Sequence, residues 1–197
     1  MSLNSVVPSP LLLASSSPRR QSLLAELGVA FECFSPDVDE TVQAGESPHD
    51  YVLRLAKAKA QAGLTYLSDA TVIGSDTSVV VDDQILGKPR NYQDFERMMT
   101  MLSGRSHQVM TSLAVLNKDR CLAQVVTTDV HFFDISAEQI QRYWQTQEPC
   151  DKAGGYGIQG KGAVFVREIE GNYSAVVGLP LAHTAQMLAE FGFTIWS

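Results

Sequence analysis

Apolar residues form two kinds of pattern along this chain, continuous short runs and a helical spacing, and these patterns divide it into expected strands and helices. Apolar runs of strand length occur at 11–14, 29–34, 71–81, 107–116, 122–133 and 163–169. Apolar residues spaced three and four apart predict helices over 18–27, 48–67, 95–102, 137–144 and 180–191. Strands and helices interleave, but a turn at 117–119 also joins two strands directly. We therefore predict an α/β fold in which helices cover a mixed β-sheet.

Residues that commonly cap helices lie at the ends of these segments. Ser17 and Ser47 each precede a proline, which suits an N-cap followed by the first helical position. The sequence from Ser136 to Gln139 has the form of a capping box. Gly28 follows the last apolar residue of the first helix and is expected to end it.

Length and composition indicate a globular protein with a core of its own. The chain has 197 residues, of which 45% are hydrophobic and 19% charged. We expect a flexible N-terminus over 1–9 and a single domain, or two small lobes, over 10–197. The first residues lack the pattern of a signal peptide, and no apolar run is long enough to span a membrane.

Charge and cysteine usage narrow the expected partners and compartment. A net charge of −7 argues against a large nucleic-acid surface, so any phosphate site must be a local basic pocket. The three cysteines are widely spaced and form no zinc pattern or disulfide framework. We therefore expect reduced thiols, a cytoplasmic location and no membrane contact.

The most informative segment is the expected strand 11–14 with the serine loop and helix start that follow it. Arg19 and Arg20 lie in the first helical turn, where the helix dipole disfavours cations. Two arginines, free backbone N–H groups and serine hydroxyls suit a polyanion such as phosphate. The alternative is a pair of solvated arginines on a surface helix.

Two charged residues interrupt apolar patterns further along the chain. Lys59 lies in the apolar stripe of the helix over 48–67, where it needs an anionic partner or a path to solvent. Asp76 lies inside the apolar strand 71–81, where a carboxylate is costly unless it is paired or bound to metal. A metal or catalytic role for Asp76 is favoured over a strand-end carboxylate bonded to nearby backbone. Arg54, by contrast, fits a solvated helix face.

Three further segments carry candidate chemistry. Glu40 lies in an acidic loop and, with Asp76, would supply the one or two carboxylates that Mg²⁺ uses beside substrate phosphates, although such loops are usually just solvated. Lys88 lies on a constrained loop and either meets a phosphate or stays at the surface. The segment from Gly155 to Gly160 reads G-x-G-x-x-G, but the strand, helix and acidic residue of a dinucleotide site are missing. We interpret it as a backbone-flexible binding loop that presents Gln159.

Six motifs in register give the chain a specific resemblance. They are Leu13-Ala14-Ser15-x-Ser17-Pro18-Arg19-Arg20, Gly74-Ser75-Asp76-Thr77, Gly87-Lys88-Pro89, Leu102-Ser103-Gly104, the segment from Asp151 to Gly160, and Val177-Gly178-Leu179-Pro180. Together they resemble the Maf family of nucleoside triphosphate pyrophosphatases. The resemblance implies a fold like that of inosine triphosphate pyrophosphatases, with an elongated mixed sheet flanked by helices and two lobes around a central cleft.

The resemblance also implies an activity, a cofactor and a set of site residues. The implied reaction hydrolyses a nucleoside triphosphate to the monophosphate and pyrophosphate with a divalent cation, Mg²⁺ or Mn²⁺. It assigns proton acceptance to Asp76, further catalytic roles to Lys59 and Lys88, and metal binding to Glu40 and Asp76. The implied substrate-binding residues are Ser15, Arg19, Arg20, Thr77 and Gln159. It also implies a homodimer acting on a small nucleotide, while the net charge argues against nucleic-acid partners.

Three positions indicate a branch within the family. Arg19, Thr77 and Gln159 resemble the branch that acts on dTTP and UTP, and a house-cleaning role that extends to modified pyrimidine nucleotides is expected. The branch that acts on 7-methyl-GTP tends to have tryptophan, glutamine and glutamate there. A 7-methyl-GTP pyrophosphatase, a broader modified-nucleotide pyrophosphatase, or a nucleotide-sensing module that influences cell division stays as an alternative.

Overall fold

A seven-stranded mixed sheet forms the centre of the computed structural model, which describes residues 9–196. Along the sheet the strands follow the order β2-β1-β3-β5-β6-β7, and β4 pairs with β3. The strands are β1 (Leu11–Ala14), β2 (Glu32–Phe34), β3 (Thr71–Val81), β4 (Gln84–Leu86), β5 (Ser106–Leu116), β6 (Cys121–Phe132) and β7 (Val166–Glu170). β1 runs parallel to β2 and β3, while the other pairs are antiparallel. The predicted α/β class with a mixed sheet is therefore confirmed.

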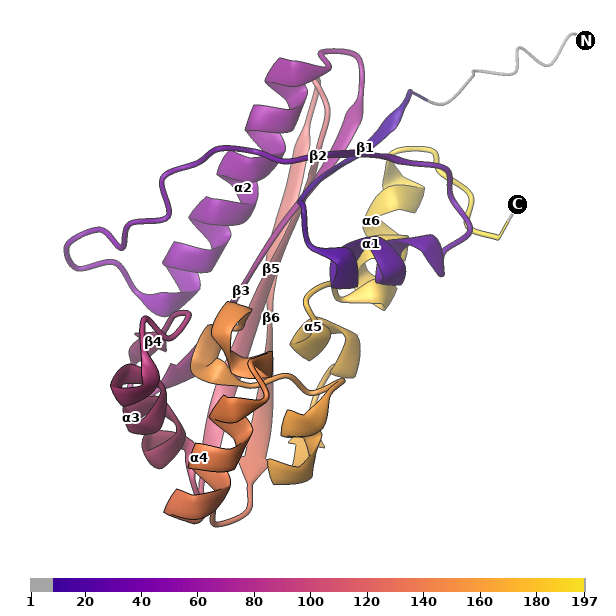
Figure 1. Ribbon diagram of the computed structural model, residues 1–197. Helices are drawn as coiled ribbons and strands as arrows, with labels where there is room; N and C mark the ends of the chain where they lie inside the picture. The colour runs from indigo at the N-terminus through magenta and orange to yellow at the C-terminus, as the bar shows by residue number, and fades with distance from the viewer. Residues whose placement is uncertain (1–8, 197) are drawn as a thin grey trace, which may run out of the picture.

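Helices cover both faces of the sheet (Figure 1). They are α1 (Pro18–Ala25), α2 (Pro48–Tyr66), α3 (Tyr92–Leu102), α4 (Ala137–Gln145), α5 (Tyr173–Val177) and α6 (Leu181–Glu190). The short 3-10 helices η1 (Glu148–Asp151), η2 (Ala153–Gly155) and η3 (Lys161–Phe165) lie between α4 and β7. Among the helices within 9–196, none is long and apolar enough to cross a membrane.

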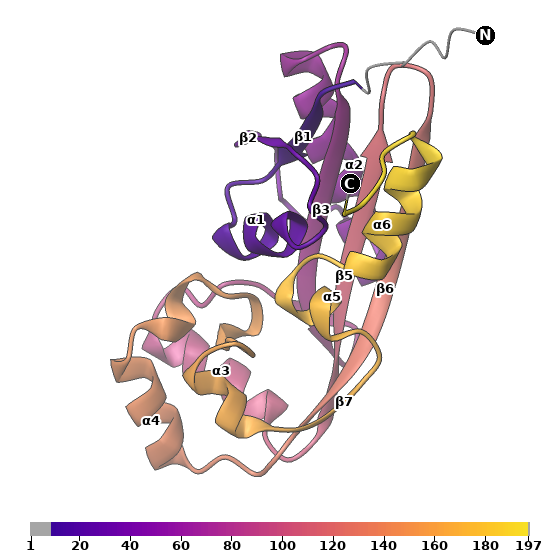
Figure 2. The same ribbon diagram turned by 90° about the vertical axis from the view of Figure 1, so that its right-hand side faces the viewer.

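The strand β1 shows how the apolar pattern places helices on the two faces. Leu11 and Leu13 pack with α1 and α6, whereas Leu12 and Ala14 pack with α2 on the opposite face. All four side chains are buried, because a strand covered on both sides needs a continuous apolar run rather than an alternating one. Figure 2 shows α2 on one side of the sheet and α1 and α6 on the other.

A separate apolar cluster holds together the part of the molecule that contains α3 and α4. Phe95 and Met99 of α3 pack with Tyr143 of α4 and with Phe132 at the end of β6. In Figure 2 these two helices lie below α1, and β3, β5 and β6 extend through both parts. This arrangement confirms two lobes on an elongated sheet.

Most of the predicted capping residues lie at the ends of helices in the structure. Ser47 accepts a hydrogen bond from the Asp50 amide, the Ser136 capping box is formed, and Gly28 has a φ of +68°. Ser17 is the N-cap of α1, but its hydroxyl does not cap the helix; its amide instead donates to Ser15 Oγ.

Four features differ from the sequence predictions. Strand β4 and helix α5 were not predicted, and β2 is shorter than 29–34. Residues 163–165 form a 3-10 turn rather than the start of a strand, because the glycines around them favour tight turns. Of the N-terminal segment expected to be flexible, 1–8 lies outside the described residues, and Ser9 Oγ is 2.9 Å from Thr71 Oγ1.

Candidate active site

A cavity of about 570 Å³ lies between the two lobes. Residues from the first loop, from β3, from the loop after β4, from the segment 151–160 and from the end of α5 line it. Every predicted site residue contributes to this lining: Ser15, Arg19, Arg20, Glu40, Lys59, Asp76, Thr77, Lys88 and Gln159. The volume falls within the range of small-molecule sites in proteins.

Arg20 is fixed from three sides at the start of α1. Its Nε donates to the Gly178 carbonyl oxygen at 2.8 Å and one terminal nitrogen donates to Thr77 Oγ1 at 3.1 Å. The other terminal nitrogen lies 3.4 Å from Ser15 Oγ. The planar guanidinium therefore joins the first loop, β3 and the end of α5, and it is preorganised where it faces the cavity.

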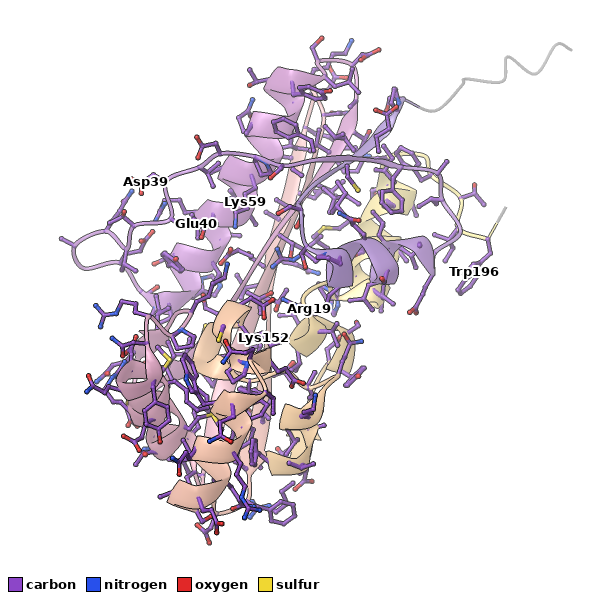
Figure 3. The ribbon with its side chains drawn as sticks, in the orientation of Figure 1. Arg19, Asp39, Glu40, Lys59, Lys152 and Trp196 are labelled. Carbon is purple, nitrogen blue, oxygen red and sulfur yellow. The ribbon has the colours of Figure 1, made fainter. Side chains whose placement is uncertain are left out.

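Arg19 lies at the rim of the same cavity and has a different environment. Its guanidinium is 3.5 Å from the Asp151 carboxylate, and the two side chains are 38% and 63% exposed. An ion pair this exposed adds little stability. The structure therefore separates the two neighbouring arginines: Arg20 is held inside the cavity, whereas Arg19 lies partly exposed beside the segment that contains Asp151 and Lys152 (Figure 3).

Lys59 lies between two carboxylates at the centre of the site. Its ammonium nitrogen is 2.7 Å from Asp76 Oδ1 and 2.7 Å from Glu40 Oε1. Lys59 and Asp76 are buried, whereas the Glu40 side chain is 56% exposed. In Figure 3, Lys59 on α2 faces Glu40 on the acidic loop. The sequence predicted that Lys59 would have either an anionic partner or a path to solvent, and it has two anionic partners.

Asp76 has the electrostatic environment of a functional carboxylate. Burial raises the pKa of Asp76 above its ordinary value, although Lys59 and Arg20 act in the opposite direction. The Asp76 amide also lies 3.3 Å from Ser112 Oγ, which anchors this point of β3 to β5. A carboxylate with a raised pKa is suited to accept a proton near neutral pH.

Two residues of α2 hold the acidic loop in place. Tyr51 donates its phenolic proton to the Glu40 carbonyl oxygen at 2.9 Å. Arg54 binds the Glu46 carboxylate at 2.6 Å and the Thr41 carbonyl oxygen at 3.0 Å. Arg54, predicted to lie on a solvated helix face, is partly exposed, at 28%, and also binds the loop. The sequence did contain a signal for this contact, because Tyr51 and Arg54 lie in the first two turns of the helix that follows the acidic loop.

The oxygen donors of Glu40 and Asp76 fit a divalent cation. Both carboxylates already converge on one positive charge, the Lys59 ammonium. Within 9–196, no group of three or more His, Cys, Asp or Glu side chains is arranged to hold a metal ion. Two carboxylates completed by substrate phosphates are the donor set that Mg²⁺ commonly uses.

The opposite side of the cavity carries residues with looser surroundings. Lys88 is exposed on the loop after β4, and Gln159 is exposed in the glycine-rich segment. Lys152, which sequence reasoning did not single out, also lines the cavity. Its ammonium donates to the Glu148 carbonyl oxygen and to Asp151 Oδ1, both at 2.7 Å. The only sequence signal for Lys152 was its place inside a recognised motif.

The sheet and the cleft define an α/β protein with a polar, enzyme-like pocket built around a buried carboxylate–ammonium pair. The sequence matches the family model described as Maf-like protein over residues 10–191. The chain therefore belongs to the Maf family.

Close relatives share nearly the whole chain. A dTTP/UTP pyrophosphatase of Vibrio parahaemolyticus is 56% identical over 182 residues, which cover 92% of this chain and 96% of that protein. A protein of the same name from Colwellia psychrerythraea is 52% identical and covers 93% of this chain and 89% of its own. Among solved structures, the Staphylococcus aureus Ham1 protein aligns with a TM-score of 0.48 at 13% identity, over 93% of this chain and 100% of that chain.

Proposed function

We propose that this protein hydrolyses dTTP and UTP to the nucleoside monophosphate and pyrophosphate, as part of a house-cleaning activity that includes modified pyrimidine nucleotides. The observation that carries the proposal is the Lys59 ammonium, 2.7 Å from both Asp76 and Glu40 in a cleft that also contains Arg20. Relatives that match nearly the whole chain are named dTTP/UTP pyrophosphatases, which supports the substrate class.

Cations lining the cleft are proposed to bind the triphosphate. A triphosphate carries about four negative charges, which repel a nucleophile approaching phosphorus, and fixed cations reduce that repulsion. Arg20 is already immobilised by its contacts with Gly178 and Thr77, so little ordering is needed when it binds a phosphate oxygen. Lys88, exposed at the edge of the cleft, adds a cation that reaches the chain of phosphates from another side.

Asp76 is proposed to accept the proton of the attacking water. Its raised pKa makes it a stronger base than an ordinary aspartate, and Lys59 keeps the deprotonated form in place. When bound, a Mg²⁺ or Mn²⁺ ion held by Glu40 and Asp76 would supply charge neutralisation at the phosphate oxygens. Tyr51 and Arg54 orient the loop that brings Glu40 into this position.

Gln159 is proposed to recognise the base. Its amide offers one acceptor and two donors, which match the N3–H and the ring carbonyl groups of thymine and uracil. The 5-methyl group of thymine adds one small apolar contact, so a site that accepts uracil also accepts thymine. Arg19 and Thr77 are proposed to contribute to the same choice of base from the other side of the cleft.

A nucleotide panel tests the proposal. The purified protein is incubated with dTTP, UTP, CTP and 7-methyl-GTP in the presence of Mg²⁺ or Mn²⁺, and pyrophosphate release is measured. We expect dTTP and UTP to have the highest kcat/KM. A preference for 7-methyl-GTP would assign the other branch of activity, and nucleotide binding without pyrophosphate release would assign a sensing role. We also propose a cytoplasmic homodimer, which light scattering and fractionation would test.

A further inference from the structure

The glycine-rich segment at the edge of the cavity forms a closed loop, which we call the Gln159 loop and define as residues 157–162. A Cβ atom on Gly162 would lie 2.9 Å from both the N and O atoms of Gly157. Such a contact is too short for a side chain, so the backbones at the two ends of the loop touch. Gln159 lies between these ends and lines the cavity.

The carboxylate of Glu148 occupies the inside of this loop. Its Oε2 accepts the Lys161 amide at 2.8 Å, and its Oε1 accepts the Gly162 amide at 3.0 Å. A Cβ atom on Gly160 would lie between 2.5 and 2.6 Å from the carboxylate atoms. Gly160 of the motif therefore has a steric reason to be glycine, because the loop closes tightly around an anion supplied by its own chain.

Tyr143 connects this carboxylate to the apolar core. Its hydroxyl donates to Glu148 Oε1 at 2.8 Å and accepts the Gly157 amide at 3.1 Å. Its ring lies 5.2 Å from the Phe165 ring and 6.0 Å from the Phe95 ring, measured between centroids. One phenol and one carboxylate thus bind three backbone amides of the loop.

Glu148 is suited to hold the loop and not to touch the substrate. Burial raises its pKa, but hydrogen bonds from the Gly162 and Lys161 amides outweigh that effect, so the pKa lies below its ordinary value and the carboxylate is ionised. Charge-assisted bonds of this kind are stronger than bonds between neutral groups. Among the described residues that line the cavity, Glu148 is absent, whereas Gln159 is present.

We propose that Glu148 is a positioning residue for base recognition: by binding the backbone amides of the Gln159 loop, it fixes the Gln159 amide at the distance and angle that select the nucleobase. The inference rests on the proposed function because it needs a nucleotide in the cleft. It goes beyond that function by assigning selectivity to a residue that does not meet the substrate.

The Glu148→Gln variant tests this role, with Glu138→Gln as the matched control. Glutamine keeps one acceptor oxygen but replaces the other with an amide nitrogen, so at least one loop amide loses its partner. Glu138 lies on α4 with an exposed side chain and pairs with Arg142, so the same chemical change there leaves the loop intact.

Three measurements distinguish positioning from general damage. In Glu148→Gln we expect hydrogen–deuterium exchange at Lys161 and Gly162 to become roughly tenfold faster, as for the loss of a charged hydrogen bond. The KM for dTTP should rise roughly tenfold with little change in kcat, and the preference for dTTP over CTP should shrink. The inhibition constant of inorganic tripolyphosphate, which has no base, should stay unchanged. Glu138→Gln should match the wild type throughout.

Several outcomes would overturn the proposal. Equal weakening of tripolyphosphate and dTTP would indicate general damage, and faster exchange with an unchanged dTTP-to-CTP preference would remove the link to selectivity. Unchanged exchange would show that Glu148 does not hold the loop. If Glu148→Gln does not fold, Tyr143→Phe takes its place, because it keeps the ring and removes two bonds from the same centre.

Failure of the proposed function is recognised separately. A wild-type protein that releases no pyrophosphate from any nucleotide contradicts the proposed hydrolysis. The inference is then judged by calorimetric affinities for dTTP, CTP and tripolyphosphate in the same variants, together with the exchange rates, neither of which requires turnover.

Discussion

The cleft has two ends that are built by different means. At the charged end, defined by Arg20, Glu40, Lys59 and Asp76, three of the four side chains project from regular elements, namely α1, α2 and β3. At the loop end, defined by Lys152, Tyr156 and the Gln159 loop, the backbone consists of 3-10 turns and irregular segments. Buried charges need partners at fixed distances, which rigid elements provide, whereas the proposed contact with a flat base needs a backbone shaped around it.

The two ends of the cleft also differ in the partners with which their polar side chains form hydrogen bonds and ion pairs. At the charged end, side chains mainly pair with side chains, as in the contact of Lys59 with Asp76 at 2.7 Å. At the loop end, side chains mainly satisfy backbone atoms, as when Lys152 binds the Glu148 carbonyl oxygen and Tyr143 binds the Gly157 amide. We therefore expect substitutions at the charged end to reduce turnover and substitutions at the loop end to change selectivity.

The largest effect is expected for Asp76→Asn. Removing a general base lowers kcat by roughly 10²–10⁴-fold, while the isosteric amide keeps the packing of β3. Pyrophosphate release at saturating dTTP and metal measures the loss, and thermal unfolding checks the fold. Asp69→Asn, at an exposed turn, is the control. A kcat within a few-fold of the wild type would remove Asp76 from the proposed mechanism.

Lys88→Ala should have an intermediate effect. Lys88 is exposed at the edge of the cleft, so solvent screens its charge and we expect a loss of about tenfold in kcat/KM with metal in excess. The loss should shrink as salt is added. Lys118→Ala in an exposed turn is the control. An unchanged kcat/KM would exclude Lys88 from the phosphate site. A loss as large as that of Asp76→Asn would contradict the expectation that an exposed charge contributes less to catalysis than a buried one.

Gln159→Glu should alter selectivity more than turnover. Glutamate accepts but cannot donate, so the variant should lose several-fold in kcat/KM for dTTP and UTP relative to GTP, in line with the loss of a single hydrogen bond. Parallel kinetics with the three nucleotides measure the ratio, and Gln141→Glu on the exposed side of α4 is the control. An identical ranking of nucleotides would show that Gln159 does not read the base.

The last prediction concerns stability rather than turnover, namely the pH dependence of the free energy of unfolding at the loop end. Burial, with smaller effects of His131 and Arg105, lowers the pKa of His107 to about 3, whereas an unfolded histidine titrates near ~6.5. Between these values the unfolded chain binds the extra proton, so His107 makes the free energy of unfolding fall as the pH falls. The contribution is at most about 1.4 kcal/mol per pH unit.

Substitution of His107 by glutamine should flatten this dependence. Glutamine does not titrate but can still meet the Tyr156 hydroxyl, which lies 2.8 Å from His107 Nε2. Urea unfolding at several pH values between 6.5 and 4 measures the slope for both proteins. Because the carboxylates are the same in both proteins, they affect both slopes alike. Equal slopes would therefore show that His107 is not the group responsible.

The two ends also differ in how well the sequence predicts them. Lys59 and Asp76 were found because each interrupts an apolar pattern, and burial of a charge signals a partner. Glu148 gives no such signal, because the turns at the loop end have no periodic pattern to interrupt. Tyr51, Lys152 and Glu148 act through contacts with loops, and such contacts depend on the path of the backbone rather than on local pattern.

The same distinction applies to the fold as a whole. The long strands β3, β5 and β6 and the helices α2 and α3 were predicted because each has enough residues to show its apolar period. The strand β4 and the helix α5, with three and five residues, are too short to show one. Their conformation is set by pairing with β3 and by contacts with β5 and β6, which no local pattern reveals.

The long strand β3 has a mechanical consequence for the enzyme cycle. It is paired with β5 continuously from Val72 to Val80 and carries Asp76 near the middle of that ladder. A sharp bend between the lobes at this point would disrupt this ladder, so the paired strands resist bending there. We therefore expect the motions that admit and release ligands to involve the segments at its sides, the acidic loop bound by Tyr51 and the Gln159 loop bound by Glu148.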